Sequence, residues 1–152
     1  MKANTRLFGE IDIEEEKIIT LESGMIGFPE LQKFTLIYDE EKEDSLIRWF
    51  QSMDDPQVAF PVIEPSRLFP SYTPTVDNSM LASLGEMKDE SVYLLNTITV
   101  PKDIEKMAVN LKAPIVINID TRKGCQLIVE DDYPVKRPIY RLLKEKKEKA
   151  GE

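Results

Sequence analysis

The sequence contains no histidine, and so it lacks the side chain that most often serves as a general base or transition-metal ligand near neutral pH. Ser-His-Asp and Cys-His catalytic arrangements are therefore excluded. A glycine-rich phosphate-binding loop is also missing, because Gly24 and Gly27 stand in the wrong context for one. We expect a protein that is not an enzyme and that has no catalytic residues, no cofactor and no metal site.

The chain has one cysteine, Cys125, which cannot form an internal disulfide. Nothing indicates an oxidising compartment. Cys125 opens an apolar segment without an evident activating base, which favours a buried, unreactive thiol over a nucleophile. No run approaches the ~20 apolar residues of a membrane-spanning helix, and the N-terminal segment lacks the apolar core of a signal peptide. We expect a cytoplasmic protein without membrane contact.

Basic residues are outnumbered, with 20 Lys and Arg against 28 Asp and Glu and a net charge of −8. Residues 133–152 carry 7 basic and 3 acidic side chains, so this end is positive and the remainder is more acidic than the total. An acidic body is a poor ligand for nucleic acid. Its acidic clusters either keep the protein soluble or steer a basic partner. The clusters are Glu10–Glu16, Asp39–Asp44 and Glu130–Asp132.

Alternation of apolar and polar residues predicts strands along most of the chain. In residues 8–14, Glu10, Asp12 and Glu14 fall on one face and Ile11 and Ile13 on the other. We expect this strand to form a hairpin with residues 17–21. Further strands are predicted at residues 34–38, 46–51, 58–63, 92–100, 115–119 and 126–129, with a turn at Lys123–Gly124 before the last.

Helical patterns are few. Residues 77–84 form a short predicted helix with Asp77 as its N-cap and Gly85 after its end, and a second helix follows Pro138. The expected fold class is mostly β: a small antiparallel β-barrel-like domain with short helices. Barrel and sandwich remain alternatives at this point. Residues 1–143 form the single predicted domain, and residues 144–152 form a charged tail that we expect to fray.

Paired carboxylates leave two alternative functions open. Asp54–Asp55 or Asp131–Asp132 would suit a carboxylate-dependent hydrolase of the glycosidase type. However, adjacent acids on a strand or turn usually point apart. The face with Glu10 would suit an acidic cation-binding structural domain, but a single strand rarely supplies the roughly six oxygen ligands of Ca²⁺.

Aromatic residues in unusual contexts offer a different kind of site. Trp49 and Phe50 are neighbours on a predicted strand, so they face opposite sides. Tyr72 lies in a proline-rich loop, where a rigid ring can anchor a partner. Asn110 and Asn118 flank a strand, and we interpret them as backbone hydrogen-bonding residues at its ends.

Several strings stand out along the chain. They are Gly24-x-x-Gly27-Phe28, Phe50-Gln51-Ser52-x-Asp54-Asp55-Pro56-x-x-Ala59-Phe60, Asn110-Leu-Lys-Ala-Pro-Ile-Val-Ile-Asn118, and Gln126-Leu-Ile-Val with Tyr133. Together they resemble the signature of the flagellar assembly factor FliW family. They occur in the family order between about Leu7 and Tyr140, and the charged tail after Leu143 has no counterpart.

The resemblance implies a β-barrel-like fold, no catalysis and two protein partners in the bacterial cytoplasm. One partner is flagellin, bound before export. The other is CsrA, an RNA-binding repressor of flagellin translation. In such a switch, binding to CsrA relieves repression, and accumulating flagellin competes for the factor and releases CsrA. No nucleic acid or membrane is a direct partner, and a monomer suffices.

Two surfaces are predicted for these partners. The first hypothesis places CsrA on an acidic face formed by Glu10, Asp12, Glu14, Glu130, Asp131 and Asp132. The second places flagellin on an apolar surface formed by Phe50, Phe60 and Tyr72, because amphipathic helices dock through apolar anchors.

Overall fold

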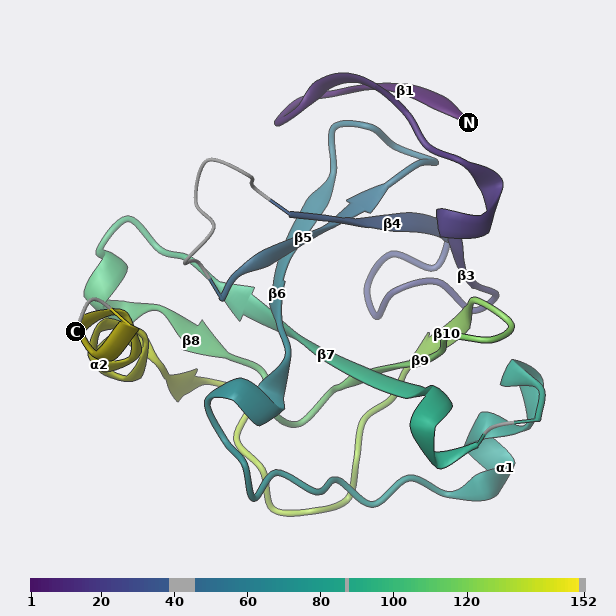
Figure 1. Cartoon of the computed structure of the whole chain (residues 1–152). Helices are drawn as coiled ribbons and strands as arrows, with labels where there is room; N and C mark the ends of the chain where they lie inside the picture. The colour runs from purple at the N-terminus through teal and green to yellow at the C-terminus, as the bar shows by residue number, and fades with distance from the viewer. Residues whose placement is uncertain (39–45, 87, 151–152) are drawn as a thin grey trace.

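Seven strands close into a barrel in the computed structural model, which describes residues 1–38, 46–86 and 88–150 (Figure 1). The acidic cluster predicted at 39–44 lies outside the described residues. The barrel order is β7-β6-β5-β4-β3-β10-β9, and pairing of β9 with β7 closes the ring. Its strands are β3 (Ile19–Leu21), β4 (Lys33–Ile37), β5 (Arg48–Ser52), β6 (Ala59–Ile63), β7 (Val92–Thr99), β9 (Ile115–Asn118) and β10 (Lys123–Gln126).

The predicted mostly β, barrel-like fold class is confirmed, and the ring decides between barrel and sandwich. Neighbouring strands pair antiparallel around the ring except β3 and β10, which pair in parallel. Closure leaves the barrel strands without an open edge, which suits a small β domain.

The other described elements surround the ring. β1 (Lys2–Thr5) and β2 (Gly9–Asp12) form a separate two-stranded sheet, while β8 (Ala108–Val109) and β11 (Arg137–Pro138) extend outward from β7. The α-helices are α1 (Asn78–Leu81) and α2 (Tyr140–Ala150). Short 3-10 turns occupy Glu15–Lys17, Pro65–Arg67, Ala82–Leu84, Asp89–Ser91 and Ile104–Lys106.

The main core fills the barrel. Phe34 on β4 and Phe50 on β5 are fully buried, and their rings stack with centroids 4.4 Å apart. The next residue, Trp49, faces outward and meets the ring of Phe8 edge-on at 6.5 Å. The predicted opposite orientation of Trp49 and Phe50 is therefore confirmed by the strand's period of two.

A second core lies outside the barrel wall. Side chains on the outer faces of β6 and β7, among them Ile63 and Ile98, pack with Ile139. Leu142 and Leu143 of α2 cover this cluster, as their helical spacing predicts. The helix continues through the charged residues 144–150, so most of the predicted tail is helical, and its fraying stays a prediction.

The predicted hairpin between residues 8–14 and 17–21 is wrong. β2 pairs with β1, whereas β3 pairs with β4 and β10. The segment Lys2–Thr5 carries no large apolar side chain, so alternation gave no signal for the true partner strand.

The predicted turn at Lys123–Gly124 is also wrong, because both residues belong to β10. The turn precedes them and ends at Arg122, whose φ is 59°. Gly124 instead allows close packing, since a Cβ there would lie 3.0 Å from the Val116 carbonyl oxygen and 3.1 Å from Ile117 Cγ1. Within the described residues, no helix is long and apolar enough to cross a membrane.

Candidate functional site

The side chains of the segment 50–60 hold the β5–β6 turn. Gln51 is fully buried, and its Nε2 donates to the carbonyls of Ser52, Pro56 and Val58 at 2.9, 3.1 and 3.1 Å. Ser52 Oγ accepts from the Asp55 backbone N–H at 3.0 Å. The Gln51 bonds add to backbone hydrogen bonds that the Val58 and Pro56 carbonyls accept from the N–H groups of Ser52 and Arg6, at 3.0 and 3.2 Å.

The Asp54–Asp55 pair is also engaged with the backbone. Asp54 Oδ2 accepts from the N–H groups of Gln32 and Lys33 at 2.7 and 2.8 Å, which ties the start of β4 to the β5–β6 turn. Asp55 Oδ1 accepts from the Gln57 N–H at 3.1 Å. The two carboxylates thus serve different backbone donors.

The interpretation of Asn110 and Asn118 as backbone hydrogen-bonding residues is confirmed. Asn118 Nδ2 donates to the carbonyls of Leu84 and Glu86 at 2.9 and 3.1 Å. Asn110 Oδ1 accepts from the N–H groups of Lys112 and Ala113 at 3.0 and 3.1 Å. The Asn118 amide therefore fastens the segment at Leu84–Glu86 to β9, and the Asn110 amide closes the turn that leads into β9.

The six predicted CsrA-facing acids form two separate groups. Glu10 and Asp12 lie exposed on β2, with Glu14 just after it, at the top of Figure 1. Glu130–Asp132 lie on the segment between β10 and β11, at the bottom of the same view. The two groups lie at opposite ends of this view, and their joint use as one acidic face stays a prediction. Binding of CsrA to either group stays a prediction.

Asp131 fastens the loop that contains Tyr72. Its carboxylate accepts from the Thr75 backbone N–H and from Thr75 Oγ1, both at 2.9 Å. Its carbonyl oxygen accepts from Lys112 Nζ at 2.7 Å. The hydrogen bonds from the backbone and hydroxyl of Thr75 lower the pKa of Asp131 below its ordinary value.

This lowered pKa predicts a pH-dependent contribution to stability. Asp131 stabilises the fold above its unfolded pKa of about 3.9, and the contribution is lost as the pH falls through the lower folded value. We expect Asp131→Ala to lower the urea midpoint at neutral pH, with a difference from the parent that shrinks below about pH 4. Asp132→Ala, at an exposed neighbour, is the control; an equal shift in both variants would contradict the prediction.

The three predicted flagellin-facing aromatics do not meet on one surface. Phe50 is fully buried in the barrel, so its assignment to an exposed surface is wrong. Tyr72 belongs to the second core, where its hydroxyl donates to the Leu111 carbonyl at 2.7 Å and its ring contacts Tyr133 at 4.7 Å. Phe60 alone lies near an open end of the barrel, against Phe28 at 5.4 Å.

An apolar groove opens beside Phe60, with a volume of about 440 Å³. Ile26, Ile128 and Val135 line it and are 49%, 60% and 57% exposed. Gln126 positions one wall, because its Oε1 accepts from the Ile26 N–H at 2.8 Å while its Nε2 donates to the Ala113 carbonyl at 3.2 Å. Ile26 lies in one loop, and Ile128 and Val135 lie in another. In the sequence, only the predicted strand at residues 126–129 gave any indication of one of them, Ile128. We call this site the apolar groove.

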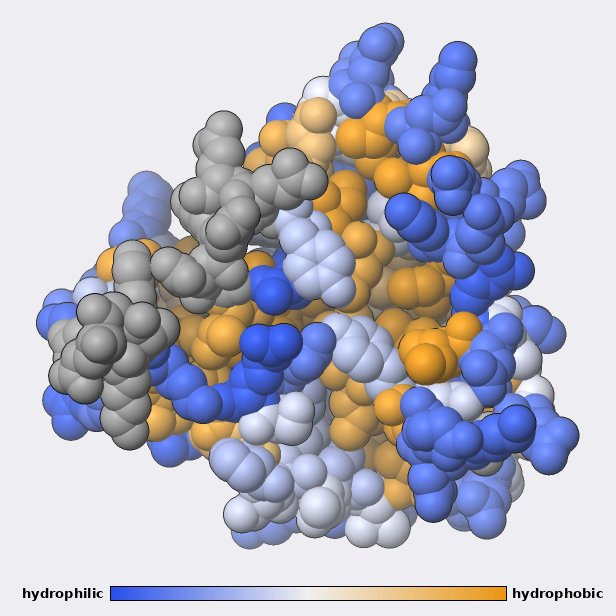
Figure 2. All heavy atoms as spheres, in the orientation of Figure 1, coloured by the Kyte–Doolittle hydropathy of each residue, from blue (hydrophilic) through white to orange (hydrophobic). Residues whose placement is uncertain are grey.

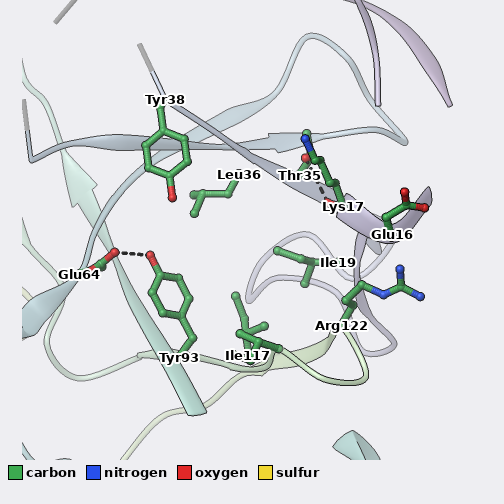
Figure 3. Close-up of a pocket in the computed structure, with 11 residues that line it drawn as sticks. Glu16, Lys17, Ile19, Thr35, Leu36, Tyr38, Glu64, Tyr93, Ile117 and Arg122 are labelled. Atoms are coloured by element: carbon green, nitrogen blue, oxygen red, sulfur yellow. Dashed lines mark hydrogen bonds between the residues drawn. The ribbon is translucent and has the colours of Figure 1, made fainter. Parts of the chain in front are cut away.

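The opposite end of the barrel holds a second cavity, of about 380 Å³ (Figure 3). Ile19, Leu36 and Ile117 form its apolar floor, and Tyr38 and Tyr93 stand on one side. In Figure 2, apolar side chains reach the surface in the centre of this face, with hydrophilic residues around them. We call this cavity the barrel mouth.

The polar groups on the tyrosine side of the barrel mouth satisfy one another. The Tyr93 hydroxyl donates to Glu64 Oε1, and Arg67 Nε donates to Glu64 Oε2 at 3.2 Å. Burial alone would raise the pKa of Glu64, but the hydrogen bonds from Tyr93 and Arg67 outweigh it and lower that pKa. Burial, followed by the bond to Glu64, raises the pKa of Tyr93, so the phenol stays protonated.

Metal and thiol chemistry find little support in the part of the chain that is described. There, no group of three or more Cys, Asp or Glu side chains is placed to hold a metal ion. Burial raises the pKa of the half-buried Cys125 thiol, which disfavours the reactive thiolate.

The fold and its sites define a small closed β-barrel protein whose open ends carry an apolar groove and a mouth cavity. The model of the family described as FliW protein matches residues 2–139. The chain therefore belongs to the FliW family.

Individual relatives and a solved structure support this family membership. The chain is 46% identical over 147 residues to the flagellar assembly factor FliW of Lachnospira eligens, covering 95% of this chain and 97% of that protein. Identity to the flagellar assembly factor FliW of Lachnoclostridium phytofermentans is 45% over 138 residues, covering 90% and 88%. A crystal structure of the flagellar assembly factor FliW matches with a TM-score of 0.83 at 32% identity, covering 92% of this chain and 97% of the other.

Proposed function

We propose that this chain is a monomeric, cytoplasmic and non-catalytic partner switch in flagellum assembly. It binds flagellin and the translational repressor CsrA in competition. Binding to CsrA relieves repression of flagellin mRNA, and accumulated flagellin displaces CsrA. Membership of the FliW family, whose relatives are named flagellar assembly factors, supports a role in assembly.

The apolar groove is the observation that carries flagellin binding. Flagellin ends are amphipathic helices, and such helices dock by inserting apolar anchors into a groove. Ile26, Ile128 and Val135 expose apolar side chains around Phe60, and among the described residues Lys112 is the one charged residue of the lining. Clustered exposed apolar residues of this kind typically mark an interaction surface.

Charge supports the second partner. An RNA-binding repressor carries a basic surface, and this chain has a net charge of −8. The β1–β2 sheet presents Glu10 and Asp12 to solvent. We place CsrA on this acidic sheet and on Glu14 beside it, since complementary charge accelerates and orients association. Competition further requires that the two partners exclude each other, and flagellin then removes the factor available to CsrA by mass action.

Charge reversal tests this placement. We expect Glu10→Lys, Asp12→Lys and Glu14→Lys together to weaken CsrA binding about tenfold at low salt, with a smaller effect at high salt. Isothermal titration calorimetry at two salt concentrations measures both values.

The control is a charge-matched triple variant at Asp89, Glu90 and Glu105, which are exposed elsewhere on the molecule. Equal weakening in both triple variants would mean that total charge, not this surface, controls affinity. Unchanged affinity in the first variant would refute the placement.

A further inference from the structure

The barrel mouth contains two cations without a matching carboxylate. Within the described residues, neither the Lys17 ammonium nor the Arg122 guanidinium forms an ion pair, and Arg122 Nη1 contacts only the Glu15 carbonyl at 3.5 Å. Glu64, by contrast, is already engaged by Tyr93 and Arg67. The remaining polar side of the mouth is therefore positive.

Glu16 is the other charged group of this lining. Figure 3 shows Glu16, Lys17 and Arg122 on the side opposite Glu64 and the two tyrosines, with the Arg122 guanidinium pointing outward at the rim. Two cations and one carboxylate leave this side with a net charge of +1, which complements a single negative charge on a ligand.

Arg122 occupies an unfavourable backbone conformation at this position. Its φ of 59° makes it the one described non-glycine residue with positive φ. Glycine or asparagine would fit such a turn with less strain. An arginine at this strained position places a guanidinium at the rim, where its one hydrogen bond among the described residues is the long contact to the Glu15 carbonyl, and such strain often accompanies a functional role.

We propose that the barrel mouth binds a small amphiphilic monocarboxylate, such as a medium-chain fatty acid. The apolar body lies on Ile19, Leu36 and Ile117, and the carboxylate meets Lys17 and Arg122. The cavity of about 380 Å³ is within the size of small-molecule sites, and the mouth of a β-barrel is a frequent place for them. A charge-assisted hydrogen bond from guanidinium to carboxylate supplies orientation.

Octanoate is the probe, added to the full ¹⁵N-labelled chain and followed by amide chemical shifts. We expect saturable shifts at Leu36, Ile117 and Arg122 and none at Ile128 in the apolar groove. Octylammonium, with the same chain and opposite charge, should bind at least about fivefold more weakly. 3-Phenylpropanoate carries the same carboxylate on an aromatic body. If it binds more tightly than octanoate, the apolar body of the ligand is aromatic rather than a fatty-acid chain.

Three variants separate binding from folding. Arg122→Gly should weaken octanoate binding about three- to tenfold without lowering the melting temperature, because glycine accepts the local φ. Lys17→Gln should weaken binding similarly, and Glu16→Gln should strengthen it about twofold. Lys102→Gln, at an exposed lysine outside the mouth lining, is the matched control.

Loss of affinity in Arg122→Gly with a normal melting temperature would support the site. Absence of saturable shifts, shifts confined to the apolar groove, or equal affinity for octanoate and octylammonium would each overturn it. These results are independent of flagellin and CsrA, so failure here leaves the proposed partner switch untouched.

Discussion

Replacing Ile128 and Val135 by glutamate is expected to lower the affinity for flagellin by roughly 50-fold or more, about 2.3 kcal/mol. Both side chains are more than half exposed, at 60% and 57%, so the fold does not depend on their burial. In the complex, however, they would meet the apolar face of a helix. Two carboxylates buried there against an apolar helix face would each carry a large desolvation cost.

The measurement is a binding titration of the double variant with flagellin, together with its melting curve. The matched control is Val92→Glu with Ile104→Glu, because these residues are also exposed, at 41% and 52%, but lie outside the groove lining. Normal flagellin binding by the groove variant would show that the apolar groove is not the flagellin-binding site. Equal losses in both variants would indicate a nonspecific effect of charge.

Gly24→Ala is expected to destabilise the fold by roughly 2–4 kcal/mol. Gly24 has a φ of +69°, and a Cβ there would lie 2.6 Å from the carbonyl oxygens of Phe28 and Pro29. Because these are backbone atoms, they cannot rotate away as a flexible side chain would. The loop that carries Met25 and Ile26 would have to shift.

Gly27→Ala is a control within the same loop. Gly27 also has a positive φ, of +88°, but a Cβ there would meet nothing within 4 Å. Gly27→Ala is therefore expected to lower the free energy of unfolding only by the cost of holding alanine at a positive φ, about 1–2 kcal/mol. Urea denaturation of both variants gives the difference. If both variants lose the same stability, the close approach at Gly24 does not contribute.

Much of the barrel could be predicted because it follows local patterns. The hairpin of β5 and β6 follows from two β-rich runs around Asp54-Asp55-Pro56, and the fully buried β9 follows from its continuous apolar run. Asp77 accepts from the Ser79 N–H at 3.0 Å, as an N-cap should.

The errors arose where pairing depends on residues distant in sequence. β3 and β10 are about a hundred residues apart, and their parallel pairing has no local signal. Gly124 suggested a turn, whereas its role is close contact with β9. β1 has no large apolar residue, so only the completed structure shows that it, rather than β3, pairs with β2.

The candidate site was predicted less well than the fold. The strings that carried the family resemblance are largely structural: Gln51 and Asp54 fasten turns, and Asn110 and Asn118 fasten loops. They therefore identify the barrel rather than a binding surface. The exposed residues of the groove come from separate loops, and their proximity depends on how the barrel closes.

The most direct test of the partner switch is a competition titration. Labelled CsrA is first saturated with this protein, and flagellin is then added in increasing amounts at two salt concentrations. We expect flagellin to release CsrA at both salt concentrations and the affinity for CsrA itself to fall as salt rises. A stable ternary complex, or no binding of either partner, would contradict the partner switch.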